Sequence, residues 1–317
     1  MSALPNALSV VSVFPLSPSL RATLTGVALA SLSTSLGGVT VVLTRFVVAE
    51  TDPLTLVFAR YGIAALFLAV LLPFTTRIPR IARRDLLVIS LLGVVMFTGF
   101  PYFMARALED TTAAHGGLVF ATMPLMTIAL GALVRVEPLT KLKSLAVLVA
   151  LAGTVAAISE RVGPAAPNAL AGDLFMLLAV IIAAAYNVFS RRFLIRYGAM
   201  TITAWTMLLG SLALMGLAFT VGGAAHGSLD FSLEGWIIVI GLAIPGAALM
   251  TFAYGKALEL ITPMSAAITV GLNPVTAILL GAVVLDEPIT LRVLAGFVLI
   301  VAGILLANWR PAQKPAA

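Results

Sequence analysis

The sequence contains two copies of one segment, separated by 150 residues. The matched positions include Ala107-Leu108-Glu109 with Ala257-Leu258-Glu259, Leu130-Gly131-Ala132 with Leu280-Gly281-Ala282, and Glu137-Pro138 with Glu287-Pro288. The correspondence runs without a gap from Ala107 to Gly153. A chain that repeats itself in this way is expected to fold as two similar units.

Composition decides what kind of unit is repeated. Hydrophobic residues make up 61% of the chain, charged residues only 10%, and the mean hydropathy is +1.12. A soluble domain is roughly half apolar and a quarter charged, so an ordinary soluble protein is excluded. There are no cysteines, which excludes disulfides and thiolate metal sites.

The apolar runs predict ten membrane-spanning helices, because each is long enough to cross about 30 Å of hydrocarbon. We expect them at residues 24–44, 54–73, 86–105, 112–133, 143–159, 171–190, 200–221, 235–255, 262–285 and 291–308. The predicted fold is therefore an all-α integral membrane protein. The expected division is a disordered cytoplasmic tail (1–20), a first repeat (21–160), a linker (161–169), a second repeat (170–309) and a cytoplasmic tail (310–317).

Five spans in each repeat give the second repeat the opposite orientation to the first, an arrangement known from alternating-access carriers. The charged residues predict the absolute orientation, because Lys and Arg in short loops stay in the cytoplasm. With both termini cytoplasmic, most of the 19 basic residues fall on the inner face and most of the 13 acidic residues on the outer face. The net charge of +6 is thus a topology signal, and no nucleic-acid partner is expected.

Several motifs occur in a fixed order along the chain. They are Gly38 to Arg45 at the end of the first span, Phe58-Ala59-Arg60-Tyr61, Gly172-Asp173-Leu174, and the mid-helix prolines followed by Gly-Ala and Glu-Pro at 124–138 and 274–288. In this order the chain, over 24–308, resembles the EamA-type branch of the drug/metabolite transporter superfamily. The resemblance implies an inner-membrane carrier that exports or exchanges small organic solutes, working as a monomer or homodimer without a cofactor.

Two polar residues within the spans are the leading candidates for substrate contact. Arg60 is the one ionisable residue well inside a predicted span, where a charge costs at least a few kcal/mol. Its guanidinium suits a carboxylate or phosphate of the solute; the alternative is that it snorkels or bonds helix carbonyls. Asn273 precedes Pro274 in mid-span, where an irregular backbone is tolerated only in protein or around water. Its alternative is an amide that joins two helices.

The remaining candidates are weaker. Asn187, Tyr186, Tyr102, Trp205 and Tyr254 are predicted to line the substrate site, with helix packing or interfacial anchoring as the alternative. Four prolines are predicted to break helices and to serve in gating: Pro101, Pro124, Pro245 and Pro274. His115 is a possible proton relay, or a hydrogen-bonded structural residue. No metal site is expected.

Two expectations concern acidic residues. Glu137 and Glu287 each precede a proline, so each carboxylate is predicted to face the positive N-terminus of the helix that follows it, with a gating salt bridge as the alternative. No Asp or Glu is expected deep in a span. That absence argues against export of cations and, more weakly, against proton antiport.

The function predicted is export or exchange of a small neutral or zwitterionic metabolite, amino-acid-like, by alternating access. The alternatives are a flippase for a lipid-linked sugar and an exporter of drug-like compounds. An integral-membrane enzyme would need His, Asp or Glu converging at one depth, and this pattern is not present in the sequence.

Overall fold

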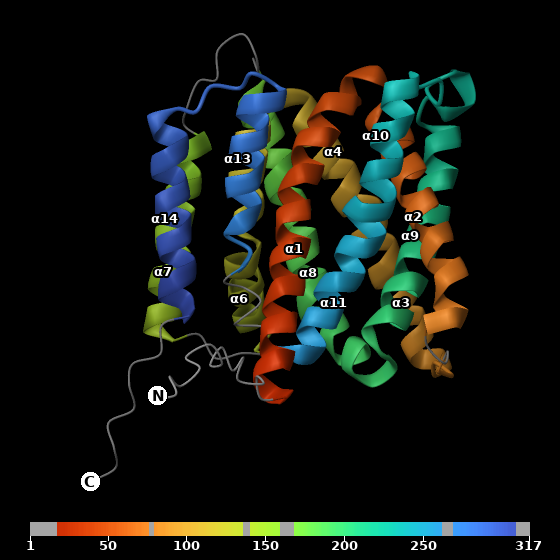
Figure 1. The fold of residues 1–317 in the computed structure, drawn as a ribbon, viewed down its shortest axis with the longest axis horizontal. Coiled ribbons are helices and arrows are strands. Elements are labelled where there is room, and N and C mark those ends of the chain that lie inside the picture. The colour runs from red at the N-terminus through yellow and green to blue at the C-terminus, as the bar shows by residue number, and fades with distance from the viewer. Residues whose placement is uncertain (1–17, 76–78, 136–139, 159–167, 262–268, 309–317) are drawn as a thin grey trace, which may run out of the picture.

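The computed structural model describes residues 18–75, 79–135, 140–158, 168–261 and 269–308. These residues form a bundle of helices that run between two opposite faces (Figure 1). The first half contains α1 (Pro18–Val47), α2 (Pro53–Thr75), α3 (Arg83–Val94), α4 (Phe100–Asp110), α5 (Ala113–Ala121), α6 (Met123–Leu133) and α7 (Lys141–Ile158). The second contains α8 (Ala169–Tyr197), α9 (Ala199–Thr220), α10 (Leu233–Ala243), α11 (Met250–Leu260), α13 (Leu272–Val284) and α14 (Leu291–Asn308).

Among the described residues, seven helices are long and apolar enough to cross a membrane: Leu20–Glu50, Pro53–Thr75, Arg83–Asp110, Ala113–Leu133, Ala169–Tyr197, Ala199–Thr220 and Leu233–Ala257. Each falls on one of the ten predicted spans. The other three predicted spans contain shorter apolar helices, Ser144–Gly153, Leu272–Val284 and Leu291–Gly303. The first helix begins at Pro18, so the last three residues of the predicted tail are helical.

Two of the long helices are interrupted by a π-helical turn. Val95–Gly99 separates α3 from α4, and Ile244–Leu249 separates α10 from α11. Pro245 lies within the second turn and Pro101 follows the first, and a proline cannot donate the backbone hydrogen bond that continues a helix. Such turns inside α-helices often mark functional sites.

The other two predicted breaks also lie where a helix restarts. Pro124 is the second residue of α6, which begins after a break at Thr122, and Pro274 is the third residue of α13. All four prolines therefore lie at helix interruptions, although their role in gating stays a prediction.

The elements recur at the interval of the sequence repeat. Helix α7 spans 141–158 and α14 spans 291–308, and the π-helical turns at 95–99 and 244–249 match in the same way. Helices α7 and α14 pack against each other at one edge of the bundle, away from α2, α3 and α9 (Figure 1). A Cβ at Gly153 would lie 2.8 Å from the carbonyl oxygen of Gly296, so the two backbones approach closely, as the glycine predicted.

Glycines also bring α1 and α13 into backbone contact. A Cβ on Gly38 would lie 2.4 Å from the carbonyl oxygen of Asn273 and 2.9 Å from the amide nitrogen of Ala277. Both are backbone atoms, which cannot rotate away as a side chain can. This contact fixes α1 against the start of α13, where Asn273 lies.

We therefore expect Gly38→Ala to destabilise the fold by about 1–3 kcal/mol, the usual cost of overpacking. Thermal unfolding of the detergent-purified protein, followed by size-exclusion chromatography after heating, measures the change. Gly216→Ala in α9 is the matched control, because a Cβ there meets nothing within 4 Å. Equal melting temperatures for the two variants would contradict the close α1–α13 contact.

Candidate functional site

The amide of Asn273 is buried at the start of α13. Its side chain is 1% exposed, and its Oδ1 atom has no hydrogen-bond partner among the described residues. Gly37 of α1 leaves room for the amide, because a Cβ there would lie 2.4 Å from Nδ2. A buried polar atom without a partner costs about 1–3 kcal/mol. The position therefore retains an unsatisfied acceptor in the protein interior.

Helix α1 presents a polar face to the interrupted helix α10–α11. The Ser33 hydroxyl donates to the carbonyl of Met250 at 2.9 Å, and the Thr40 hydroxyl donates to the carbonyl of Gly37 at 2.8 Å. Spacings of three to four residues place Ser33, Gly37, Thr40 and Thr44 on one side of the helix. The three hydroxyl residues are all buried. The sequence analysis did not identify this face, although its spacing is visible in the sequence.

The Arg60 side chain is 2% exposed and holds the π-helical turn of the second half. Its Nε donates to the carbonyl of Leu242 at 3.2 Å, and its Nη2 donates to the carbonyl of Gly246 at 3.0 Å. Nη1 donates to Thr44 Oγ1 at 3.4 Å, and the guanidinium lies 5.0 Å from the centre of the Tyr61 ring. The guanidinium thus bonds helix carbonyls around Pro245. Contact with a solute carboxylate stays a prediction.

A chain of aromatic rings extends from Arg60 to the first π-helical turn. The Tyr61 and Phe97 rings lie 5.9 Å apart, as do those of Phe97 and Tyr186. The Tyr186 hydroxyl lies 3.2 Å from Thr206 Oγ1. Tyr186 therefore belongs to the interior of the bundle, at the junction of η2 with α8 and α9.

The structure does not gather the other aromatic and amide candidates at one place. Tyr102 packs against Phe103, with ring centres 5.2 Å apart, and Tyr254 packs beside Ala30 and Ala257. Asn187 is exposed on α8, and Trp205 is 36% exposed on α9. Their roles in substrate binding stay predictions.

A buried polar cluster joins the two halves at one end of the bundle. Asp173 of α8 is fully buried: its Oδ1 accepts from Thr111 Oγ1 at 2.7 Å, and its Oδ2 lies 3.1 Å from His115 Nδ1. Gly172 permits this approach, because a Cβ there would lie 2.7 Å from the carbonyl of Ala107. The sequence analysis missed the pair because it judged Asp173 by its depth in the span. Near the end of a helix, the carboxylate is nonetheless enclosed by protein.

Glu287 does face a helix N-terminus, but the predicted helix was wrong. Its carboxylate accepts from the amide nitrogens of Ala113 at 2.9 Å and Ala114 at 3.2 Å, at the start of α5. The first turn of a helix has free N–H groups and a partial positive charge, so the carboxylate is stabilised there. Glu287 thereby links the second half to the first. Its counterpart Glu137 lies outside the described residues.

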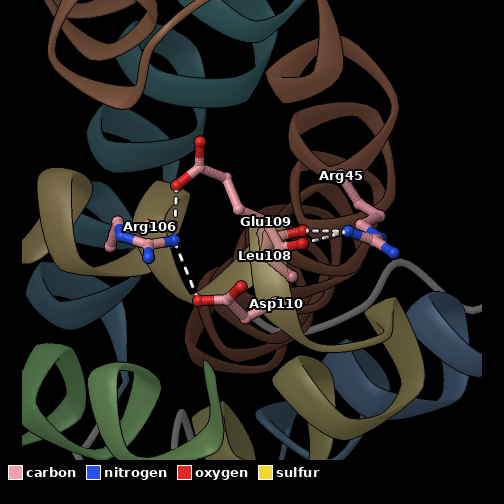
Figure 2. A network of polar contacts seen from close by, with 5 residues as sticks. All are labelled: Arg45, Arg106, Leu108, Glu109 and Asp110. Atoms are coloured by element: carbon pink, nitrogen blue, oxygen red, sulfur yellow. Dashed lines mark hydrogen bonds and ion pairs between the residues drawn. The ribbon is translucent and has the colours of Figure 1, made fainter. Parts of the chain in front are cut away.

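The same end of the bundle carries a charged network around the last turn of α4 (Figure 2). Arg45 Nη1 donates to the carbonyls of Leu108 at 2.6 Å and Glu109 at 2.9 Å, where a cation suits the C-terminus of a helix. Arg106 forms ion pairs with Glu109 at 2.6 Å and Asp110 at 2.8 Å. The Arg106 side chain is 35% exposed, so we expect these pairs to stabilise the fold little.

Asp52, in the turn before α2, connects that helix to the loop after α9. Partial burial pushes the pKa of Asp52 upward, but hydrogen bonds from the hydroxyl and amide of Thr55 and from the amide of Gly223 together lower it below its ordinary value of 3.8. The carboxylate therefore stabilises the fold above that pH, and this contribution is lost as the pH falls below it.

The described residues contain no group of three or more His, Cys, Asp or Glu side chains placed to hold a metal ion. The polar groups gathered inside the bundle are instead amides, hydroxyls and one guanidinium, which bind organic solutes by hydrogen bonds.

Comparison with known proteins gives one family. The model of the EamA-like transporter family matches twice, over residues 24–159 and 170–309. An uncharacterized transporter of Archaeoglobus fulgidus is 25% identical over 276 residues, which cover 87% of this chain and 96% of that protein. The uncharacterized transporter YyaM of Bacillus subtilis is 23% identical, covering 86% of this chain and 89% of its own length. Protein PecM of Dickeya dadantii is 27% identical, with 70% and 73% covered.

A solved structure, described only as a crystal structure of a protein, has the same fold. It superposes with a TM-score of 0.65 at 22% sequence identity and covers 90% of this chain and 96% of that one.

Proposed function

Because the chain belongs to the EamA-like transporter family, we propose that it is a secondary carrier of the inner membrane that exports or exchanges a small metabolite. The family and the seven apolar helices establish a multi-pass membrane protein of the transporter type. The substrate is a neutral or zwitterionic compound, amino-acid-like. It crosses by alternating access, so that one site opens first to one face of the membrane and then to the other.

The observation that carries this proposal is the unpartnered Oδ1 of Asn273. A folded protein retains an unsatisfied buried acceptor where a ligand or water satisfies it during function. Here the acceptor lies at a helix break and beside the backbone of α1. An ammonium or hydroxyl group of a solute would supply the missing donor.

Ten spans in two inverted repeats are part of the proposal, and two contacts support them. The C-terminal end of α1 lies beside the end of α4, through Arg45 and the carbonyl of Leu108. The N-terminal end of α1 lies beside the end of α11, since a Cβ on Gly26 would be 2.6 Å from Ile261. Helices α4 and α11 are 150 residues apart, and they end at opposite ends of α1. The family matches over 24–159 and 170–309 support the same division.

The charges in the interior favour a substrate without net positive charge. Arg60 is buried and bonds only neutral groups, so its positive charge repels a cation in the low-dielectric interior. The buried carboxylate of Asp173 is occupied by Thr111 and His115. A zwitterion or neutral solute avoids this repulsion.

A resistance screen tests the function directly. A deletion strain and an overexpressing strain are compared across toxic analogues of amino acids, other metabolites and drug-like compounds. We expect overexpression to protect against an amino-acid analogue and deletion to sensitise to it. Protection only against drug-like compounds, or a defect only in lipid-linked sugars, would replace the proposed substrate with one of those alternatives.

A further inference from the structure

We propose that the His115–Asp173 pair binds one proton, and that this proton favours closure of the bundle at the end where the pair lies. The inference rests on the proposed alternating access and adds a coupling ion to it. It starts from the pair itself: Nδ1 of His115 and Oδ2 of Asp173 are 3.1 Å apart, with side chains 2% and 0% exposed.

The position of the pair connects protonation to the contact between the halves. His115 belongs to α5 in the first half and Asp173 to α8 in the second. Glu287, also of the second half, holds the first two amides of the same helix α5. The second half therefore grips the start of α5 with two carboxylates. Opening at this end must separate them from α5 and expose them to water.

The protonation state of the buried pair follows from its charge. An ionised Asp173 beside a neutral His115 leaves one uncompensated charge in the interior, which is costly. One proton shared by the pair makes it neutral as a whole, whichever of the two residues holds it. Water stabilises the unprotonated pair once this end opens. Opening therefore releases a proton, and acid favours the closed arrangement.

Other charged groups surround the pair at this end and must be separated from its effect. On the elements packed against α5 and α8 they are Arg45, Arg106, Glu109, Asp110, Asp286, Glu287 and Arg292. The other charged groups of α8, Arg191, Arg192 and Arg196, lie at its opposite end. Variants of the pair alone therefore decide the assignment.

The test uses the absence of cysteine from the chain. Ala113→Cys places one thiol in the buried seam between α5 and α13, where the Ala113 side chain lies 3.5 Å from the Cβ position of Gly281. Labelling by a membrane-impermeant maleimide is measured in lipid nanodiscs at pH 6, 7 and 8. Each rate is divided by that of Ala225→Cys, an exposed site in the loop before α10, which corrects for thiol ionisation.

We expect the corrected rate to fall as the pH falls, by about 3- to 10-fold per pH unit, the upper limit being that of one proton. His115→Gln and Asp173→Asn should each abolish this dependence. Thr111→Val should keep it, because it removes only a neutral hydrogen bond to Asp173.

Labelling that does not depend on pH in the Ala113→Cys protein would overturn the proposal, as would a dependence that persists in both pair variants. Size-exclusion chromatography identifies a misfolded variant, and the other pair variant then decides. No substrate enters the experiment, so a failed resistance screen and a failed proton site give separate results.

Discussion

Asn273→Leu is expected to reduce transport by roughly tenfold or more while the protein still inserts and folds. Leucine has almost the volume of asparagine but lacks both polar atoms of the amide. If Oδ1 meets the substrate, the variant loses a hydrogen bond that is worth about 1.5–3 kcal/mol when the donor is charged. Removing an unpartnered buried acceptor is neutral or stabilising for the fold. Loss of transport should thus come with an unchanged or higher melting temperature.

This combination separates a binding role from a structural one. An amide that only joined helices would lose stability on substitution, and transport would fall with it. The matched control is Thr276→Val, one turn along α13, whose hydroxyl bonds the carbonyl of Leu272 in its own helix. Efflux of the compound found in the resistance screen is measured for both variants at equal membrane expression. Normal flux in Asn273→Leu would remove the residue from the site.

Arg60→Leu is expected to destabilise the protein by about 2–4 kcal/mol, since hydrogen bonds to a charged group contribute about 1.5–3 kcal/mol each. The variant leaves the carbonyls of Leu242 and Gly246 without their donors inside the bundle. These carbonyls flank Pro245, so the π-helical turn loses the side chain that holds it. The melting temperature of the purified protein and its transport activity should both fall.

Two variants distinguish this role from a general effect of charge. Arg60→Lys keeps the charge but cannot reach two carbonyls with a planar fork, so it should recover only part of the stability. Arg106→Leu removes an arginine whose ion pairs are one-third exposed, and it should change the melting temperature little. Equal effects of Arg60→Leu and Arg106→Leu would contradict the bracing role.

Much of the fold could be predicted from the sequence, because membrane helices need long apolar runs and proline marks their interruptions. The seven long helices fall on predicted spans, and all four selected prolines lie at breaks. The contact of the helices that contain Gly153 and Gly303 was also visible as small residues at matching positions. These features depend on residues close together in the chain.

The contacts between distant segments could not be predicted in this way. The partner of Glu287 is the start of α5, 174 residues away, and not the adjacent helix. Asp173 and His115 meet because Gly172 lets α8 approach the end of α4, which neither span reveals alone. Arg60 could be identified as buried, but its carbonyl partners depend on the packing of α2 against the second π-helical turn.

Alternating access at Asn273 requires two halves of opposite orientation, and a topology measurement tests this most directly. Reporter fusions that are active on one side of the inner membrane only are placed after Arg161, between the halves, and after Pro311, beyond the second half. Five spans separate the two positions in the proposed plan, so the reporters should be found on opposite sides, with Arg161 outside and Pro311 in the cytoplasm. Activity of both reporters in the same compartment would contradict the inverted repeat and the carrier mechanism that depends on it.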